Sequence, residues 1–271
     1  MRLGTIVALR SDVDESFRQL REIGLTGCQL NCSDASLYTE DIAGKVREIT
    51  GRLGIKISTF FCGWPGPKVW DFYEGQITLG IVPPEYRYAR SEALKLGSDF
   101  AKLLGVDQIG THAGFIPENP LDPVYAAVVM TLRDIINHCE KNGQKFLFET
   151  GQETPITLLR LIEDIGKKNI GVNLDPANLL MYGKANPVDA LDILGPYVLD
   201  AHAKDGEYPV NGRKLGVEKP LGSGRVNFPK FIARLRELGY KGPVTIEREI
   251  TGEQQKKDIQ EAIKLLEPLI S

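Results

Sequence analysis

Short apolar segments alternate with longer amphipathic segments along the whole chain, and this alternation constrains the fold more than any other feature. The eight short segments are rich in β-branched or aromatic residues and are bounded by Gly, Pro or polar turn residues. They cover residues 3–9, 27–32, 56–63, 108–114, 145–151, 169–176, 197–205 and 243–249. Segments of this length and composition predict buried β-strands.

The longer segments have the spacing of amphipathic helices, as in Phe17, Leu20 and Ile23. Strands separated by a helix are expected to pair in parallel. Division of the 271 residues by eight gives about 34 residues per strand–helix unit, which matches a (β/α)8 or TIM barrel. An open doubly wound sheet is disfavoured because Ala8-Leu9-Arg10-Ser11 follows the first strand in place of a Gly-rich dinucleotide-binding turn. We therefore predict one α/β domain over residues 1–271.

Composition limits the classes of binding partner and the cellular compartment that we expect for this protein. With 33 Lys and Arg against 36 Asp and Glu, the net charge is −3, which argues against a dedicated nucleic-acid binder or a polybasic membrane binder. No apolar stretch reaches the ~18 residues that a membrane span needs, and the four cysteines form no CxxC pair. We expect a cytoplasmic protein with reduced thiols and a small-molecule substrate. Homo-oligomerisation stays open.

Four consecutive predicted strands end in a side chain that can bind a metal. These residues are Glu149, Asp175, His202 and Glu247, which follow one another at intervals of 26, 27 and 45 residues. The first two intervals fit one compact strand–helix repeat, and the third fits a repeat with the long connection 206–227. Since parallel strands end at one face of a barrel, the four side chains should converge there. Three carboxylates and one imidazole suit a single divalent cation, with Mn²⁺ favoured and Mg²⁺, Co²⁺ or Zn²⁺ compatible.

Around these ligands the sequence resembles the sugar isomerase and epimerase superfamily with a xylose isomerase-like barrel. The resemblance rests on Phe148-Glu149-Thr150, Asn173-Leu-Asp-Pro-Ala-Asn178, His202-Ala-Lys-Asp205, the segment 221–228 and Thr245-Ile-Glu247. It implies that the four ligands hold the cation and that Glu149 and Glu247 also act as the catalytic acid/base pair. Many members carry His where this chain has Asn178, so the substrate contacts of that position are open.

A ligand set of this kind predicts proton transfer in a ketose-type sugar or sugar phosphate. Chelation of a carbonyl and its neighbouring hydroxyl stabilises an enediolate, and two carboxylates can remove and return the proton, which gives isomerisation or epimerisation. The same groups can eliminate water, so a lyase acting on an inosose- or dehydroshikimate-type ketone is the alternative. An endonuclease IV-like repair enzyme is a remote alternative, because its three zinc ions need more than the three histidines of this chain.

Further side chains are candidates for the substrate pocket. His112 follows the fourth strand, and Lys204 shares the face of His202, where an ion pair with Asp205 or another acid is an equal alternative. Trp64, with Trp70, lies in a long connection after the third strand. Arg225 closes Gly222-Ser-Gly-Arg225, a candidate phosphate site whose simpler reading is a loop-closing turn. Glu249 is in phase with Glu247 and is the other candidate ligand of that strand.

Overall fold

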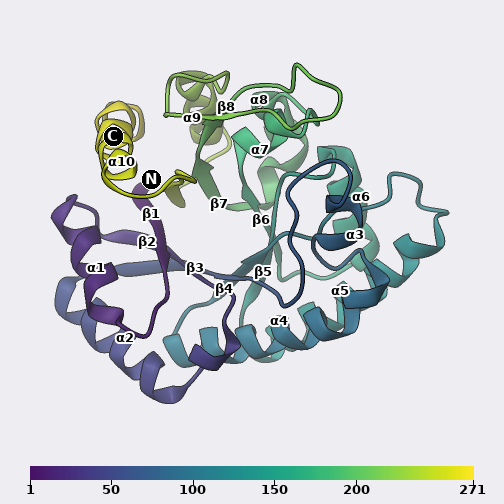
Figure 1. Cartoon of the computed structure of the whole chain (residues 1–271), viewed down its shortest axis with the longest axis horizontal. Coiled ribbons are helices and arrows are strands. Elements are labelled where there is room, and N and C mark those ends of the chain that lie inside the picture. The colour runs from purple at the N-terminus through teal and green to yellow at the C-terminus, as the bar shows by residue number, and fades with distance from the viewer.

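Eight parallel strands close into a barrel in the computed structural model, which describes residues 1–271 (Figure 1). The strands are β1 (Arg2–Ala8), β2 (Gly27–Cys32), β3 (Lys56–Cys62), β4 (Gln108–Thr111), β5 (Lys145–Glu149), β6 (Ile170–Leu174), β7 (Val198–Ala203) and β10 (Pro243–Ile246). They follow the order β1-β10-β7-β6-β5-β4-β3-β2, and β1 closes on β10. All eight predicted strands are present, and the predicted single-domain (β/α)8 barrel is confirmed.

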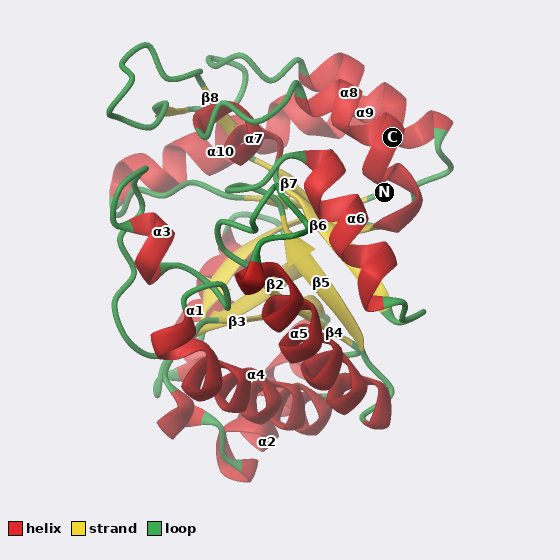
Figure 2. Cartoon of the chain, turned by 90° about the vertical axis from the view of Figure 1, so that its right-hand side faces the viewer, coloured by secondary structure: helices red, strands yellow, loops and turns green.

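Helices surround the barrel (Figure 2). They are α1 (Val13–Glu22), α2 (Glu40–Leu53), α3 (Gly75–Thr78), α4 (Pro84–Leu104), α5 (Pro123–Lys141), α6 (Pro155–Ile165), α7 (Pro176–Met181), α8 (Pro187–Leu194), α9 (Phe228–Glu237) and α10 (Glu253–Ile270). Their ends follow the sequence locally: Thr39 caps the start of α2 through its side-chain oxygen, and Gly54 ends α2 with a φ of 63°.

The core lies between the barrel and the helices, where 59 buried apolar residues form one cluster. The barrel interior also holds a polar group. Asp200 of β7 is fully buried and accepts hydrogen bonds from Ser58 (2.9 Å), Thr59 (2.8 Å) and Thr245 (3.0 Å). Burial raises the pKa of Asp200, and the three hydroxyl donors oppose that rise. These bonds connect β7 with β3 and β10 at a position two residues before His202.

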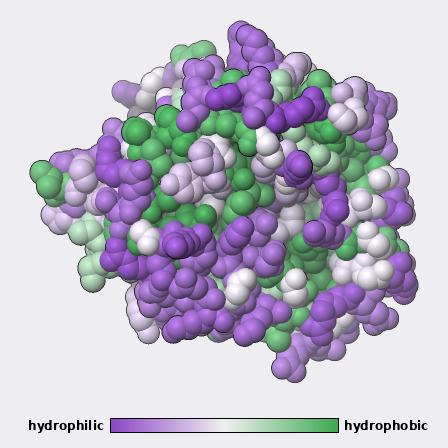
Figure 3. All heavy atoms as spheres, turned by 180° about the vertical axis from the view of Figure 1, so that it is seen from behind, coloured by the Kyte–Doolittle hydropathy of each residue, from purple (hydrophilic) through white to green (hydrophobic).

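The two longest connections follow β3 and β7, as predicted. The first runs from Gly63 to α4 and contains α3, and the second holds the short antiparallel pair β8 (Asp205–Gly206) and β9 (Glu218–Lys219). None of the helices is both long and apolar enough to cross a membrane. Seen from behind, hydrophilic residues surround and separate the hydrophobic ones at the surface (Figure 3).

Candidate metal centre and substrate cavity

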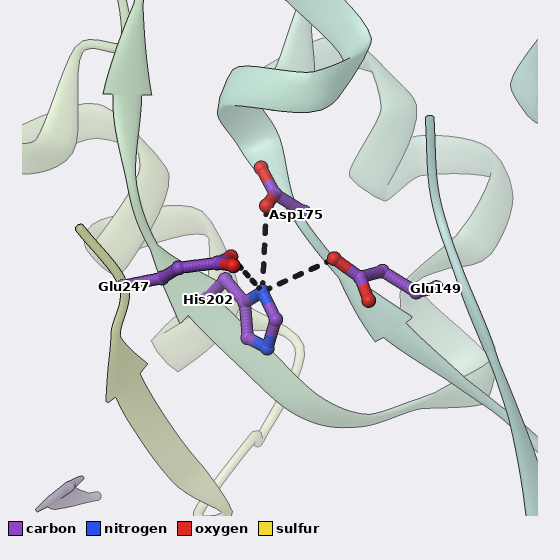
Figure 4. A group of neighbouring side chains, drawn as sticks. All are labelled: Glu149, Asp175, His202 and Glu247. Atoms are coloured by element: carbon purple, nitrogen blue, oxygen red, sulfur yellow. Dashed lines mark hydrogen bonds and ion pairs between the residues drawn. The ribbon is translucent and has the colours of Figure 1, made fainter. Parts of the chain in front are cut away.

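The four predicted metal ligands meet at the carboxyl-terminal ends of four adjacent strands (Figure 4). Glu149 is the last residue of β5, Asp175 directly follows β6, His202 lies in β7, and Glu247 directly follows β10. One ligand atom of each residue lies within 4.8 Å of the corresponding atoms of the others. The parallel strand order therefore brings together residues that are up to 98 positions apart.

All three carboxylates face one nitrogen of the imidazole. His202 Nδ1 lies 2.9 Å from Glu247 Oε2, 3.3 Å from Asp175 Oδ2 and 3.4 Å from Glu149 Oε1. A single Nδ1 can donate at most one hydrogen, so it cannot satisfy three acceptors. A cation among the four groups would satisfy all of them. The excess of three acceptors over one hydrogen is therefore the observation that fits these residues to a metal ion.

The charges near the cluster fit a divalent ion. Three ionised carboxylates stand beside the Lys204 ammonium, whose Nζ is 3.6 Å from Asp175 Oδ2 and 3.5 Å from Glu247 Oε2. Because Lys204 is closer still to Glu249 (2.7 Å), its charge does not balance the three carboxylates of the cluster, and a divalent cation would offset the remaining negative charge. Burial would lower the pKa of Lys204, but Glu247 and Asp175 raise it well above its ordinary value, so Lys204 stays charged.

The second ring nitrogen of His202, Nε2, contacts a residue that sequence reasoning missed. Gln29 Oε1, from β2, lies 3.0 Å from His202 Nε2, and Asn173 Nδ2, from β6, lies 2.9 Å from the same nitrogen. With the ring hydrogen on Nε2, where Gln29 Oε1 can accept it, the imidazole has its lone pair on Nδ1, directed at the carboxylates, as a metal ligand requires. The signal in the sequence was a polar residue within the buried segment Gly27–Cys32, which the ligand search at strand ends did not cover.

Local structure fixes Asp175 and Asn178 relative to Glu149. Asp175 caps α7, and its Oδ1 accepts the Asn178 N–H at 2.8 Å, which leaves Oδ2 for the cluster. Thr150 Oγ1 bonds the backbone of Asp175 and so connects the ends of β5 and β6. The Asn178 side chain donates to Glu149 Oε1 at 3.3 Å and accepts from Lys204 at 3.2 Å. Asn178 thus contacts a ligand without belonging to the cluster.

The sequence leaves open which acid pairs with Lys204 and whether Glu247 or Glu249 is the ligand, and the contacts of these side chains distinguish the alternatives. Lys204 donates to Glu249 Oε1 at 2.7 Å, and it forms no ion pair with Asp205. The side chain of Glu249 is 56% exposed and lies outside the cluster, whereas Glu247 is a member.

A cavity of about 380 Å³ opens above the cluster. Its lining residues include Glu149, His202 and Glu247 and three predicted pocket residues, His112, Trp64 and Asn178, with Trp70 beside them. His112 Nε2 lies 3.3 Å from Glu149 Oε2, and its ring packs edge-on against Trp70, with 5.0 Å between centroids. Lys204 is buried beneath this surface and is not among the lining residues.

The segment Gly222–Arg225, the candidate phosphate site, binds a carboxylate of the protein itself. The Asp205 carboxylate accepts hydrogen bonds from the backbone N–H groups of Gly222 (2.9 Å), Gly224 (3.0 Å) and Val226 (3.0 Å). These donors are already satisfied by an anion of the protein itself. Arg225 is exposed and does not line the cavity, so we withdraw it from the candidate substrate contacts. The loop-closing turn, which was the simpler reading, is what the structure shows.

The cavity wall also includes polar residues that sequence reasoning did not single out. Gln152 and Tyr182 line the cavity, and the Gln152 amide atoms and the Tyr182 hydroxyl are buried without hydrogen-bond partners. Buried polar groups in proteins are nearly always paired. Polar groups of a bound molecule would supply the missing partners. Neither residue stands at a strand end, which is why the sequence offered no signal for them.

Two curated relatives match part of this chain. The uncharacterized protein MJ1311 of Methanocaldococcus jannaschii is 29% identical over 177 residues, which is 61% of this chain and 56% of that protein. A human hydroxypyruvate isomerase-like protein is 26% identical over 206 residues, which is 68% of each chain. The match thus spans little more than half the length of the first relative.

Solved structures cover nearly the whole chain. A xylose isomerase domain protein from Planctomyces limnophilus is 36% identical with a TM-score of 0.93 over 99% of this chain and 96% of that one. Two more distant structures share the fold. D-psicose 3-epimerase in the presence of D-fructose is 15% identical, with a TM-score of 0.73 and coverage of 100% and 99%. A magnesium-bound barrel protein from Mycobacterium smegmatis is 19% identical, with a TM-score of 0.66 and coverage of 95% and 89%.

The family comparison spans most of the barrel and agrees with the ligand geometry. The model described as "xylose isomerase-like TIM barrel" matches residues 17–269, from α1 to the end of α10. The chain belongs to the xylose isomerase-like TIM barrel family.

Proposed function

We propose that this protein is a divalent-metal-dependent isomerase or epimerase of a ketose-type sugar. The observation that carries the proposal is the Glu149–Asp175–His202–Glu247 cluster at the floor of a cavity with room for a small sugar. Neighbours of the same fold include a sugar 3-epimerase and a magnesium-bound barrel, which agrees with this class of reaction and with a divalent ion.

The bound cation would polarise the carbonyl and the neighbouring hydroxyl oxygen of the ketose and so favour loss of a proton from the carbon that bears the hydroxyl. The residues of this chain supply the proton transfer. Glu149 and Glu247 reach the cluster from opposite sides (Figure 4), so one can remove a proton from one face of a substrate carbon and the other can return it. Return to the opposite face gives an epimer, and return to the neighbouring carbon gives an aldose.

The two glutamates have different surroundings. Burial raises the pKa of Glu247, but Lys204 and His202 outweigh it and lower the pKa below its ordinary range, so Glu247 is held ionised as a base. Glu149 faces His112 Nε2 at 3.3 Å, a group that can exchange a proton with it. Asn178 holds Glu149 from the other side through its amide.

Substitution of each glutamate tests this assignment. Glu149→Gln and Glu247→Gln keep the shape of the side chain but remove the proton acceptor, and each should lower turnover by at least ~100-fold. The assay follows solvent deuterium uptake into ketoses by NMR, with Mn²⁺, Mg²⁺, Co²⁺ or Zn²⁺ added. Circular dichroism verifies that the variants fold. Unchanged turnover in either variant would refute the acid/base assignment.

The same assay separates the two enzymatic alternatives. An isomerase or epimerase incorporates deuterium into a ketose without loss of water, whereas a dehydratase releases water and forms a conjugated ketone. The endonuclease alternative loses support from the position of the histidines. His138 does not line the cavity and pairs with Asp99, with 2.7 Å between Nε2 and Oδ1, so His112 and His202 are the only cavity histidines.

A further inference from the structure

One wall of the cavity carries a cation that forms no ion pair. Lys68, from the connection between β3 and α4, is exposed and lines the cavity, with its Nζ 5.8 Å from the centroid of the Trp64 ring. The groups that act on the pKa of Lys68 are Arg90 and the sulfur atoms of Cys62 and Cys32, and no carboxylate is among them. Lys204, the cation beneath the cavity floor, is instead paired with Glu249.

A second cation behind this wall adds to the charge. Arg90 of α4 is fully buried and donates to three backbone carbonyl oxygens, those of Pro65 (3.1 Å), Gly80 (2.7 Å) and Pro67 (2.9 Å). Its guanidinium packs over the Trp64 ring at 5.4 Å and has no carboxylate partner. Burial, and after it the charge of Arg90, lower the pKa of Lys68.

The third member of the wall is a hydrogen-bond donor without an acceptor. Trp64 is only 3% exposed, lines the cavity, and has its Nε1 buried with no partner. An indole N–H can only donate, and an ammonium likewise offers donors alone. The buried Trp64 Nε1 therefore lacks an acceptor, and an anion would supply one to it and to the Lys68 ammonium beside its ring.

A series of contacts connects this wall to the metal ligands. His112 contacts Glu149 at 3.3 Å and packs against Trp64 and Trp70, with ring centroids 6.4 Å and 5.0 Å away. Lys68 in turn packs against the Trp64 ring. The cavity therefore combines an acidic floor with aromatic residues and a cation on its wall.

We propose that the substrate is an anionic ketose whose phosphate or carboxylate group binds Lys68 and Trp64 while its carbonyl end lies at the metal ligands. This inference rests on the proposed function and adds the substrate class. The anion site comes from the β3–α4 connection. The segment Gly222–Arg225 does not supply it, because its N–H groups already bind Asp205.

A matched set of three ketoses tests the inference. D-Fructose, D-fructose 6-phosphate and D-fructuronate share one carbon skeleton and differ at one terminal carbon, which carries a hydroxyl, a phosphate or a carboxylate. Their dissociation constants are measured by calorimetry on the Mn²⁺-loaded wild type, Lys68→Gln and Lys214→Gln. Lys214 is a matched control, because it is exposed, forms no ion pair and does not line the cavity. Trp64→Phe removes only the N–H donor while keeping an aromatic ring.

We expect at least one anionic ketose to bind wild type roughly tenfold more tightly than fructose, as one charge-assisted hydrogen bond would give. The preferred anion identifies the group as phosphate or carboxylate. Lys68→Gln should abolish the preference, Trp64→Phe should reduce it, and Lys214→Gln should retain it. Equal affinity for all three ketoses, or an equal effect of Lys68→Gln on all three, would overturn the inference.

The binding readout keeps this result separate from the proposed function. If the anion preference is found but no ketose takes up solvent deuterium with any metal, the anion site stands and the isomerase assignment fails. If deuterium uptake proceeds with fructose as readily as with its anionic analogues and affinities are equal, the isomerase assignment stands and the anion site is wrong.

Discussion

Asp205 is expected to hold the whole connection after β7 in place. Its carboxylate is 1% exposed and accepts four backbone N–H groups: those of Gly206, Gly222, Gly224 and Val226, at 2.8 to 3.0 Å. Three of these bonds join the end of the strand to a segment 17 to 21 residues further along the chain. Asp205→Ala removes all of them at once.

The magnitude follows from the exposure of the donors. The N–H of Val226 is in a buried residue and cannot be satisfied by water, whereas Gly222 is exposed and Gly224 half-buried, so water replaces part of their bonds. At ~1 kcal/mol for each of the three distant bonds, the free energy of unfolding should fall by ~3 kcal/mol. For a domain of this size that corresponds to a melting temperature lower by roughly 6 to 12 °C.

Urea unfolding followed by circular dichroism measures the loss, and limited proteolysis measures the opening of residues 207–221. Asp205→Asn is the control, because it keeps the size and one acceptor oxygen but removes the charge, and it should retain about half of the stability that Asp205→Ala loses. If Asp205→Ala unfolds within ~0.5 kcal/mol of wild type and its loop resists protease, the carboxylate does not organise this connection.

Two further predictions concern the metal centre. In the metal-free protein, burial lowers the pKa of His202, but the charges of Glu149 and Glu247 outweigh burial and raise this pKa well above 6.5. Stability from the protonated imidazole is therefore present below the unfolded pKa and is lost as pH rises through the folded pKa. The cation needs the neutral imidazole, so the rise in melting temperature on adding Mn²⁺ to chelator-treated protein should grow as pH rises toward the folded pKa of His202, and a pH-independent rise would contradict this. Lys204→Met removes the ammonium from among the carboxylates, which should destabilise the metal-free protein by roughly 3 to 5 kcal/mol and tighten Mn²⁺ binding; calorimetry that shows weaker binding would refute that reasoning.

The strands and the metal ligands could be predicted because both follow from local pattern and repeat length. Apolar runs separated by helical segments specify parallel strands, and parallel strands end on one face. Once the strands were placed, Glu149, Asp175 and His202 fell at equivalent heights by counting residues alone. The choice of Glu247 over Glu249 needed coordinates, since both are in phase on the same strand.

Trp64 was a pocket candidate from the sequence, but the rest of the polar wall of the cavity could not be predicted from local pattern. Lys68 and Trp64 lie in a connection without regular periodicity, and their position depends on Arg90 of α4, which binds three carbonyl groups of that connection. Gln152 and Tyr182 likewise reach the cavity from segments outside the strands. The exposed position of Arg225 has the same cause, because Asp205 determines the path of its loop.

By itself, the sequence determined the barrel, its eight strands and the residues that meet at their ends, because these depend on short apolar runs and on the length of each repeat. Only the tertiary structure decided which nitrogen of His202 faces the carboxylates, which acid neutralises Lys204, and which cation stays unpaired above the site. Those outcomes depend on contacts between residues far apart in the chain, as between Gln29 and His202. No local pattern encodes such contacts, because they arise when separate loops pack over the same end of the barrel.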